Sequence, residues 1–112
     1  VRKREGSRAL LFDQHKYLKG WINKKTKETI LHDPNETLDE WAFSGIHIIN
    51  RSIFDHLPKT GKFSITPHYI RLAKTNPILA YPHQDDFWFD IGKPNTLSDA
   101  CQFFELNPNI GY

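Results

Sequence analysis

The sequence predicts one α/β domain whose mixed sheet is covered by helices. Two observations predict this class. Short apolar runs bounded by polar or turn residues recur along the chain, and each has the length of a strand rather than of a helix. Segments with helical spacing of apolar residues lie between and after these runs. We therefore expect the order strand, strand, central strand, helix, helix, strand, strand, helix.

The first half of the chain supplies most of the predicted sheet. Residues 8–12 and 18–22 are apolar runs joined by the polar residues 13–16, which is the pattern of a hairpin. Residues 23–40 are polar, with lysines first and acids later, and we interpret them as a loop with one short strand. Residues 41–49 are almost continuously apolar, which predicts a strand buried on both faces at the centre of the sheet.

Cap residues mark two helices after this strand. Asn50 is a favoured N-cap, and we expect a short helix through Ile53 and Phe54. Thr66 followed by Pro67 predicts the start of a second helix, because proline is preferred in the first helical turn. The buried face of this second helix is predicted to consist of Tyr69, Ile70, Leu72 and Ala73.

The last third of the chain predicts two more strands and a helix. We expect strands at residues 78–81 and 87–91, joined by a turn that contains Asp85 and Asp86. Thr96 has an acidic partner three residues later, which predicts the N-cap of the final helix. The apolar face of this helix is predicted to consist of Leu97, Ala100, Cys101 and Phe104.

Composition argues against several functional classes. The 112 residues carry 15 basic and 13 acidic side chains, so we expect no nucleic-acid partner, and we interpret the basic run at residues 2–4 as solvated. No apolar run has the length of a membrane span. The single Cys101 cannot form an internal disulfide, so we expect a cytoplasmic protein with Cys101 in its core. The six histidines show no zinc-ligand spacing, and no serine lies in a Gly-x-Ser-x-Gly frame.

Asp90 and Gly45 are the strongest candidate site residues. Asp90 is a carboxylate in an aromatic strand that ends at Gly92, so its charge requires a partner or solvent. The partner can be a metal ion or the cation of a structural ion pair. Gly45 interrupts a bulky strand, which either admits a ligand or marks a bulge. Strict alternation puts Ser44 and Gly45 on opposite faces. Lys24 and two neighbouring lysines follow a strand end, where one of them can reach a phosphate while the others remain solvated.

Three separated segments resemble, in order and spacing, the C-terminal half of the bacterial sugar-1-phosphate nucleotidyltransferases. They are AFSGIH at residues 42–47, GKFSI at residues 61–65 and WFDIGKP at residues 88–94. The runs SRALLFD at residues 7–13 and GWIN at residues 20–23 extend the likeness over nearly the whole chain. The sequence is similar to the branch that includes N-acetylmuramate-1-phosphate uridylyltransferases and mannose-1-phosphate guanylyltransferase-like proteins.

The resemblance implies a fold, a reaction and a set of site residues. The fold is the Rossmann-like nucleotide-diphospho-sugar transferase fold. The reaction joins a nucleoside triphosphate to a sugar 1-phosphate and releases pyrophosphate, with Mg²⁺ as the cofactor. Asp90 matches the second metal-binding, catalytic aspartate of the family. Gly45, Ser44 and Asn23 match positions at the sugar, and Lys24 matches a position at the phosphate.

Parts of the family pattern have no counterpart in residues 1–112. The missing parts are the glycine-rich triphosphate loop and the first metal aspartate. A third motif differs in sequence, because Asn23 and Lys24 stand near where many relatives carry Glu-Lys-Pro. The chain also begins at Val1 and contains no methionine. We therefore expect a fragment without the N-terminal nucleotide-binding half, inactive alone, that meets that half or a second copy through an apolar sheet edge. The alternative is a noncatalytic regulatory or small-ligand-binding module on the same fold.

Overall fold

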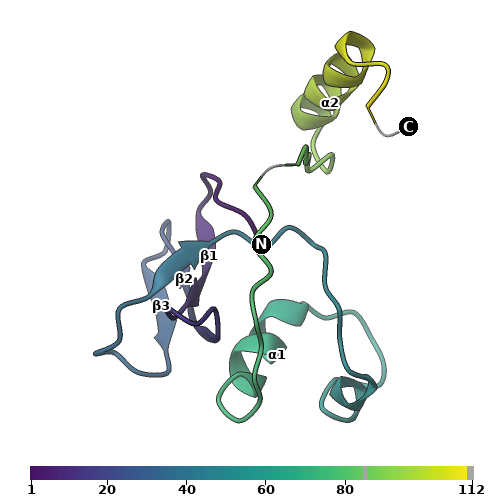
Figure 1. Cartoon of the computed structure of the whole chain (residues 1–112). Coiled ribbons are helices and arrows are strands. Elements are labelled where there is room, and N and C mark those ends of the chain that lie inside the picture. Colours follow the sequence, from purple (N-terminus) through teal and green to yellow (C-terminus); the bar gives the residue numbers. More distant parts are fainter. Residues whose placement is uncertain (85, 111–112) are drawn as a thin grey trace.

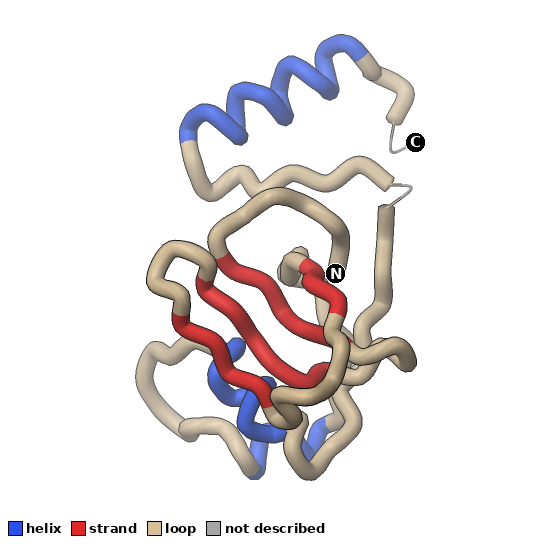
Figure 2. Tube along the Cα trace, turned by 90° about the vertical axis from the view of Figure 1, so that its left-hand side faces the viewer, coloured by secondary structure: helices blue, strands red, loops and turns tan. Residues whose placement is uncertain are grey.

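The computed structural model describes residues 1–84 and 86–110, which form a four-stranded antiparallel sheet, two α-helices and one short 3-10 helix. The strand order in the sheet is β3-β2-β1-β4 (Figures 1 and 2). The elements are β1 Arg8–Phe12, β2 Leu18–Asn23, β3 Glu28–Leu31, β4 Asp39–Trp41, the 3-10 helix η1 Arg51–Asp55, α1 Ile65–Leu72 and α2 Pro94–Leu106. The predicted fold class, a small α/β domain with helices beside a sheet, is therefore confirmed. The sheet is antiparallel rather than mixed, and a Rossmann-like arrangement is not confirmed.

The predicted β1–β2 hairpin is confirmed, and its turn is built around Asp13. The Asp13 carboxylate accepts hydrogen bonds from the backbone N–H groups of His15 at 2.9 Å and Tyr17 at 3.0 Å. Lys16 adopts the left-handed conformation, with φ 69°, that brings the chain back into the second strand. Asp13 is buried, and these hydrogen bonds compensate for the water that its carboxylate has lost.

The polar region of residues 23–40 contains two strands where we expected one. β3 pairs with β2, with Leu31 opposite Gly20, and it is the expected short strand. β4 pairs with β1 at the other edge of the sheet, with Asp39 opposite Phe12. Sequence pattern did not reveal β4 because two of its three residues are exposed acids, which carry no apolar alternation.

The hydrophobic core lies between the sheet and α1. Leu10, Phe12 and Leu18 from the hairpin pack with Tyr69 and Ile70 from α1, and all five are buried. Figure 1 shows α1 beside the sheet. The predicted helix and its buried face are thus confirmed, although the helix begins one residue before Thr66 and its N-cap position is occupied by Ser64. The predicted short helix is also confirmed, because the Asn50 side chain accepts the N–H of Ser52 at the start of η1.

The predicted central strand at residues 41–49 is wrong. Only Trp41 belongs to a strand, and the following residues run as a loop in which Ile46 is 67% exposed and Ile48 is fully exposed. β4 is the edge of the described sheet, so these apolar residues have no neighbouring strand with which to pair. Their β-branched composition favours a strand only where a partner supplies hydrogen bonds and burial.

The two predicted late strands are also absent as paired elements. Residues 78–80 form only an isolated bridge with the hairpin, in which Leu18 N–H donates to the Ile78 carbonyl and Ala80 N–H donates to the Lys16 carbonyl. Residues 87–91 are without strand pairing in the described chain. Of the predicted turn between them, Asp86 is described and Asp85 lies outside the described residues.

Helix α2 stands apart from the sheet and packs on the segment that precedes it (Figure 1). Phe103 contacts Phe87 and Phe89, with ring centroids 4.6 and 5.2 Å apart. The radius of gyration is 16.2 Å, whereas a compact domain of about 100 residues has about 13 Å. The detached position of α2 accounts for this extension.

Two details of α2 correct the sequence predictions. The helix begins at Pro94, and the Thr96 hydroxyl donates back to the Lys93 carbonyl at 3.0 Å, so Thr96 is not the N-cap. Ala100 is buried as expected, but Cys101 is exposed, so Cys101 has no core role. Among the described helices, none is long and apolar enough to cross a membrane.

Candidate functional site

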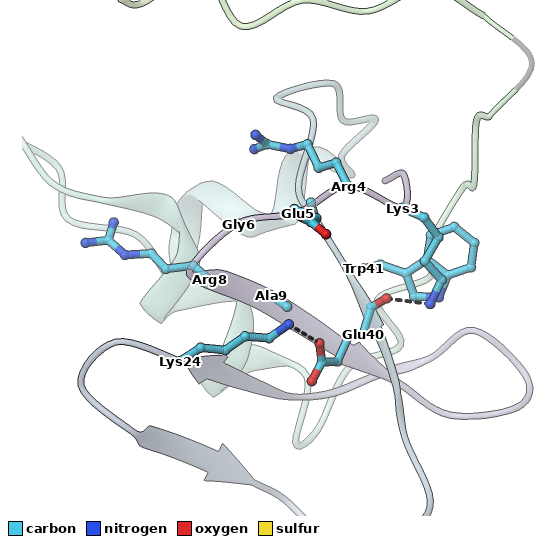
Figure 3. A pocket seen from close by; sticks show the side chains of 10 residues that line it. Lys3, Arg4, Glu5, Gly6, Arg8, Ala9, Lys24, Glu40 and Trp41 are labelled. Atoms are coloured by element: carbon cyan, nitrogen blue, oxygen red, sulfur yellow. Dashed lines mark hydrogen bonds and ion pairs between the residues drawn. The ribbon is translucent and has the colours of Figure 1, made fainter.

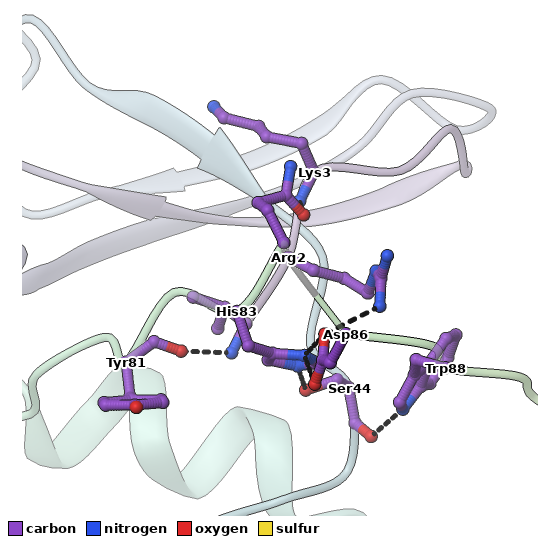
Figure 4. Close-up of polar contacts among 9 residues, drawn as sticks. Arg2, Lys3, Ser44, Tyr81, His83, Asp86 and Trp88 are labelled. Carbon is purple, nitrogen blue, oxygen red and sulfur yellow. Dashed lines mark hydrogen bonds and ion pairs between the residues drawn. The ribbon is translucent and has the colours of Figure 1, made fainter. Parts of the chain in front are cut away.

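The basic N-terminal segment is ordered and joins two later parts of the chain. Arg2 and Ala42 exchange both backbone hydrogen bonds, at 3.1 and 2.9 Å, and the N–H of His83 donates to the Val1 carbonyl at 2.9 Å. The first residues therefore lie between the loop after β4 and the segment around His83 (Figure 4). The Arg4 guanidinium also lies over the Trp88 ring, 4.8 Å from its centroid. Lys3 and Arg4 are exposed, as expected of a solvated run, whereas Arg2 is partly buried.

Ser44, a predicted sugar-site residue, is held through both its side chain and its backbone. Its hydroxyl oxygen lies 2.7 Å from His83 Nε2, and its carbonyl oxygen accepts the indole N–H of Trp88 at 3.0 Å (Figure 4). Ser44 is only 7% exposed. The loop after β4 therefore lies beside both His83 and Trp88.

His83 is itself fixed by a carboxylate. Its Nδ1 lies 2.9 Å from both carboxylate oxygens of Asp86, and Arg2 Nη1 donates to the same carboxylate at 3.4 Å. The hydrogen bond from His83 is the main cause that lowers the pKa of Asp86, and the charges of His83 and Arg2 act in the same direction. The Asp86 carboxyl group consequently stays ionised at a more acidic pH than an ordinary aspartate.

Position 45 needs a glycine because its backbone has a positive φ, not because a neighbouring group packs closely against it. Its φ is +82°, and a Cβ atom built at this position would meet nothing within 4 Å. The loop is anchored on both sides of this turn, since the His47 ring is hydrogen-bonded to the Tyr69 hydroxyl and Phe43 packs edge-on against Tyr69. Burial raises the pKa of that Tyr69 hydroxyl.

Replacing Gly45 with alanine should lower the free energy of unfolding by about 1–2 kcal/mol, because an L side chain is strained at this positive φ. Urea denaturation followed by circular dichroism measures the change. Gly45→Asn is the matched variant and should cost less, since asparagine tolerates positive φ better than alanine. An alanine variant as stable as the wild type would show that the turn relaxes to another conformation.

Asn23 and Lys24 lie together at the end of β2. The Asn23 amide oxygen accepts the N–H groups of Lys25 at 3.1 Å and Thr26 at 3.4 Å, so it closes the β2–β3 turn. Lys24 Nζ forms an ion pair with Glu40 Oε2 at 2.6 Å. These contacts give Asn23 a structural role and hold the Lys24 ammonium group next to β4.

A cationic cavity of about 410 Å³ contains Lys24 (Figure 3). Its charged lining residues are Lys3, Arg4, Glu5, Arg8, Lys24 and Glu40. Four of these six side chains are basic, and Glu40 is already paired with Lys24. This excess of positive charge suits an anionic ligand. Sequence reasoning missed Lys3, Arg4 and Arg8, although the basic run in which two of them stand was the available signal.

Asp90 lies in the connection to α2, away from the sheet. Its carboxylate is exposed and accepts one hydrogen bond, from the Gly92 N–H at 3.1 Å. Within residues 1–84 and 86–110 no three histidine, cysteine or acidic side chains are grouped so that they could hold a metal ion.

The predicted site residues thus fall in three places. Ser44 and Gly45 lie against the segment of Trp88, and Asn23 and Lys24 lie by the cationic cavity, whose lining also includes Ala42. Asp90 stands two residues beyond Trp88 on the chain. Comparisons of the chain with protein-family models, with curated proteins and with solved structures gave no match.

Proposed function

We propose that this chain is the sugar-binding and second metal-ligand part of a sugar-1-phosphate nucleotidyltransferase. One observation carries the proposal. The hydrogen bond from the Trp88 indole N–H to the Ser44 carbonyl joins two of the three motif segments that resemble this family, 44 residues apart in the sequence. A sugar phosphate held at Gly45 and a metal ion held at Asp90 require these two segments to be neighbours.

The cationic cavity supports the phosphate-binding part of the proposal. Lys24 matches the phosphate position of the family, and it shares its cavity with Arg4 and Arg8. Arginine can bind a phosphate through two parallel hydrogen bonds, and lysine adds a mobile positive charge. Lys24 would bind the sugar phosphate, and Arg4, whose guanidinium lies over Trp88, and Arg8, which points away from Lys24 in Figure 3, would join it only after their side chains turn.

Exposed apolar segments support the proposed Rossmann-like fold and a nucleotide-binding half as partner. Residues 42–49 and 87–91 are rich in β-branched and aromatic residues, yet Ile46, Ile48 and Phe87 are largely exposed. Extended apolar segments of this kind are covered in stable proteins. We propose that the nucleotide-binding half pairs with them as neighbouring strands, which would convert the sheet to a mixed one.

The proposed reaction needs little covalent chemistry from the chain. A phosphate oxygen of the sugar 1-phosphate attacks the α-phosphorus, a new P–O bond forms, and the bond to the bridging oxygen breaks as pyrophosphate leaves. When bound, Mg²⁺ would supply charge stabilisation for this transfer. Asp90 offers one carboxylate oxygen as a ligand, and the Lys24 ammonium group orients the attacking phosphate.

Asp90→Asn should reduce pyrophosphate release at least about 100-fold in the natural protein that joins this chain to a nucleotide-binding half, because the amide carries no charge for the metal ion. A coupled phosphate assay with a nucleoside triphosphate and a sugar 1-phosphate measures the rate. Asp99→Asn is the control, since it removes the same charge from an exposed position on α2. Normal pyrophosphate release by Asp90→Asn would refute the enzymatic proposal.

Lys24→Gln should raise the KM for the sugar 1-phosphate about tenfold and leave the KM for the nucleoside triphosphate unchanged, because a charge-assisted hydrogen bond is lost on one substrate only. The same assay provides both constants. Lys25→Gln serves as the matched control, as Lys25 is exposed and is not part of the cavity lining. Equal effects of the two substitutions would remove Lys24 from the phosphate site.

A further inference from the structure

We propose that Trp88, His83 and Asp86 are positioning residues that aim the Gly45 N–H group at a sugar oxygen. The inference rests on the proposed function, in which Gly45 lies against the sugar. It starts from a hydrogen-bonded chain of three side chains, in the order Asp86, His83, Ser44, seen in Figure 4. It also uses the separate hydrogen bond from Trp88 to the Ser44 carbonyl.

The chemistry of the three side chains fixes the protons between them. An ionised carboxylate only accepts hydrogen bonds, so the Nδ1 atom of His83 that faces Asp86 must carry a proton. In the neutral imidazole the other nitrogen, Nε2, is then an acceptor. In this neutral form the Ser44 hydroxyl, 2.7 Å from Nε2, is the donor, whereas a protonated His83 would donate from Nε2 to the Ser44 oxygen. Asp86 therefore sets the His83 tautomer, and His83 sets the direction of the Ser44 hydroxyl proton.

The Trp88 contact fixes the peptide unit that contains the Gly45 N–H. The Ser44 carbonyl and the Gly45 N–H belong to the same planar trans peptide, so they point in opposite directions. Because the indole N–H of Trp88 holds the carbonyl at 3.0 Å, the Gly45 N–H is turned away from Trp88. No described residue accepts a hydrogen bond from this N–H, and Gly45 is exposed. The group is thus an oriented donor without a protein acceptor.

The order of the side chains is also that of a serine nucleophile with its histidine base and aspartate. Burial distinguishes the two roles. A nucleophile must reach a substrate atom, whereas Ser44 is 7% exposed and both its hydroxyl and its carbonyl are engaged. The next residue, Gly45, is exposed. The geometry therefore favours positioning of Gly45 over attack by Ser44.

The kinetic test compares His83→Ala with His83→Gln in the natural protein that joins this chain to its nucleotide-binding half. His83→Ala should raise the KM for N-acetylmuramate 1-phosphate or mannose 1-phosphate about tenfold, with no change in the KM for the nucleoside triphosphate. His83→Gln should recover most of this loss, because its amide oxygen can accept the Ser44 hydroxyl proton. His15→Ala, at an exposed turn position, is the control. Equal KM values for wild type and His83→Ala would overturn the inference.

A second test needs no substrate and uses the 112-residue chain itself. Nitrogen-15 NMR of the imidazole should show the proton of neutral His83 on Nδ1, and His83→Ala should shift the Gly45 amide signal. A proton on Nε2, an unmoved Gly45 signal, or labelling of Ser44 by a fluorophosphonate would overturn the inference. Absence of transferase activity in the natural protein would refute the proposed function but not the positioning of Gly45. The two substrate-free measurements would then decide whether these side chains position Gly45.

Discussion

Phe12→Ala should lower the free energy of unfolding by about 3–5 kcal/mol, which is the cost of removing a large aromatic ring from a close-packed core. Phe12 is 2% exposed, and its ring packs with Leu18 of β2 and Tyr69 of α1. The loss has two sources. The variant forfeits the burial of apolar surface, and the sheet and α1 cannot fully close the cavity that remains. The expected cost approaches the total stability of a small domain, which is about 5–15 kcal/mol.

Urea denaturation measures this loss as a lower midpoint with an unchanged slope. Phe54→Ala removes the same ring from η1, where the side chain is 60% exposed, and it should cost less than about 1 kcal/mol. Equal stabilities of the two variants would show that the core does not lie between the hairpin and α1.

Gly20→Ala should lower the free energy of unfolding by about 3 kcal/mol through a backbone clash. A Cβ atom at this position would lie 2.3 Å from the Ile30 carbonyl oxygen and 3.3 Å from side-chain carbons of Leu11 and Leu31. β2 has a partner strand on each side, so it cannot move away from β3 without breaking its pairing with β1. Overpacking of this kind is among the few single-methyl changes that cost several kcal/mol.

The matched control for Gly20 is Gly6→Ala. A Cβ atom at Gly6 meets only the Arg8 carbonyl oxygen, at 4.0 Å, so this variant should retain the wild-type urea midpoint within the error of the measurement. Amide hydrogen exchange adds a local readout, because Gly20→Ala should accelerate exchange in β3 before it does so in α1. Wild-type stability of Gly20→Ala would mean that β2 and β3 are not paired as described.

The elements that sequence pattern predicted correctly are those with local causes. The hairpin follows from two apolar runs and the side-chain hydrogen bonds of Asp13, and η1 follows from the cap at Asn50. Helix α1 has an apolar face whose spacing is visible in its own sequence. None of these features needs information from a distant part of the chain.

The candidate site was predictable only in part, because the contacts that build it join distant parts of the chain. Ser44 and Gly45 were singled out because a serine and a glycine in an apolar run are visible in sequence. The contacts of Ser44 with His83 and Trp88 join residues 39 and 44 positions apart, and no spacing rule connects them. The short spacings among the six histidines cannot reveal that His83 has a partner on another segment.

The sequence by itself determined the hairpin, the two helices and the short 3-10 helix, because turn chemistry, capping and helical periodicity act over a few residues. Only the tertiary structure decided that the sheet is antiparallel and ends at β4, and that residues 42–49 form a loop, because an apolar run becomes a strand only beside a partner strand. It also decided which basic side chains share a cavity and that His83 holds Ser44, since such contacts depend on where distant segments pack.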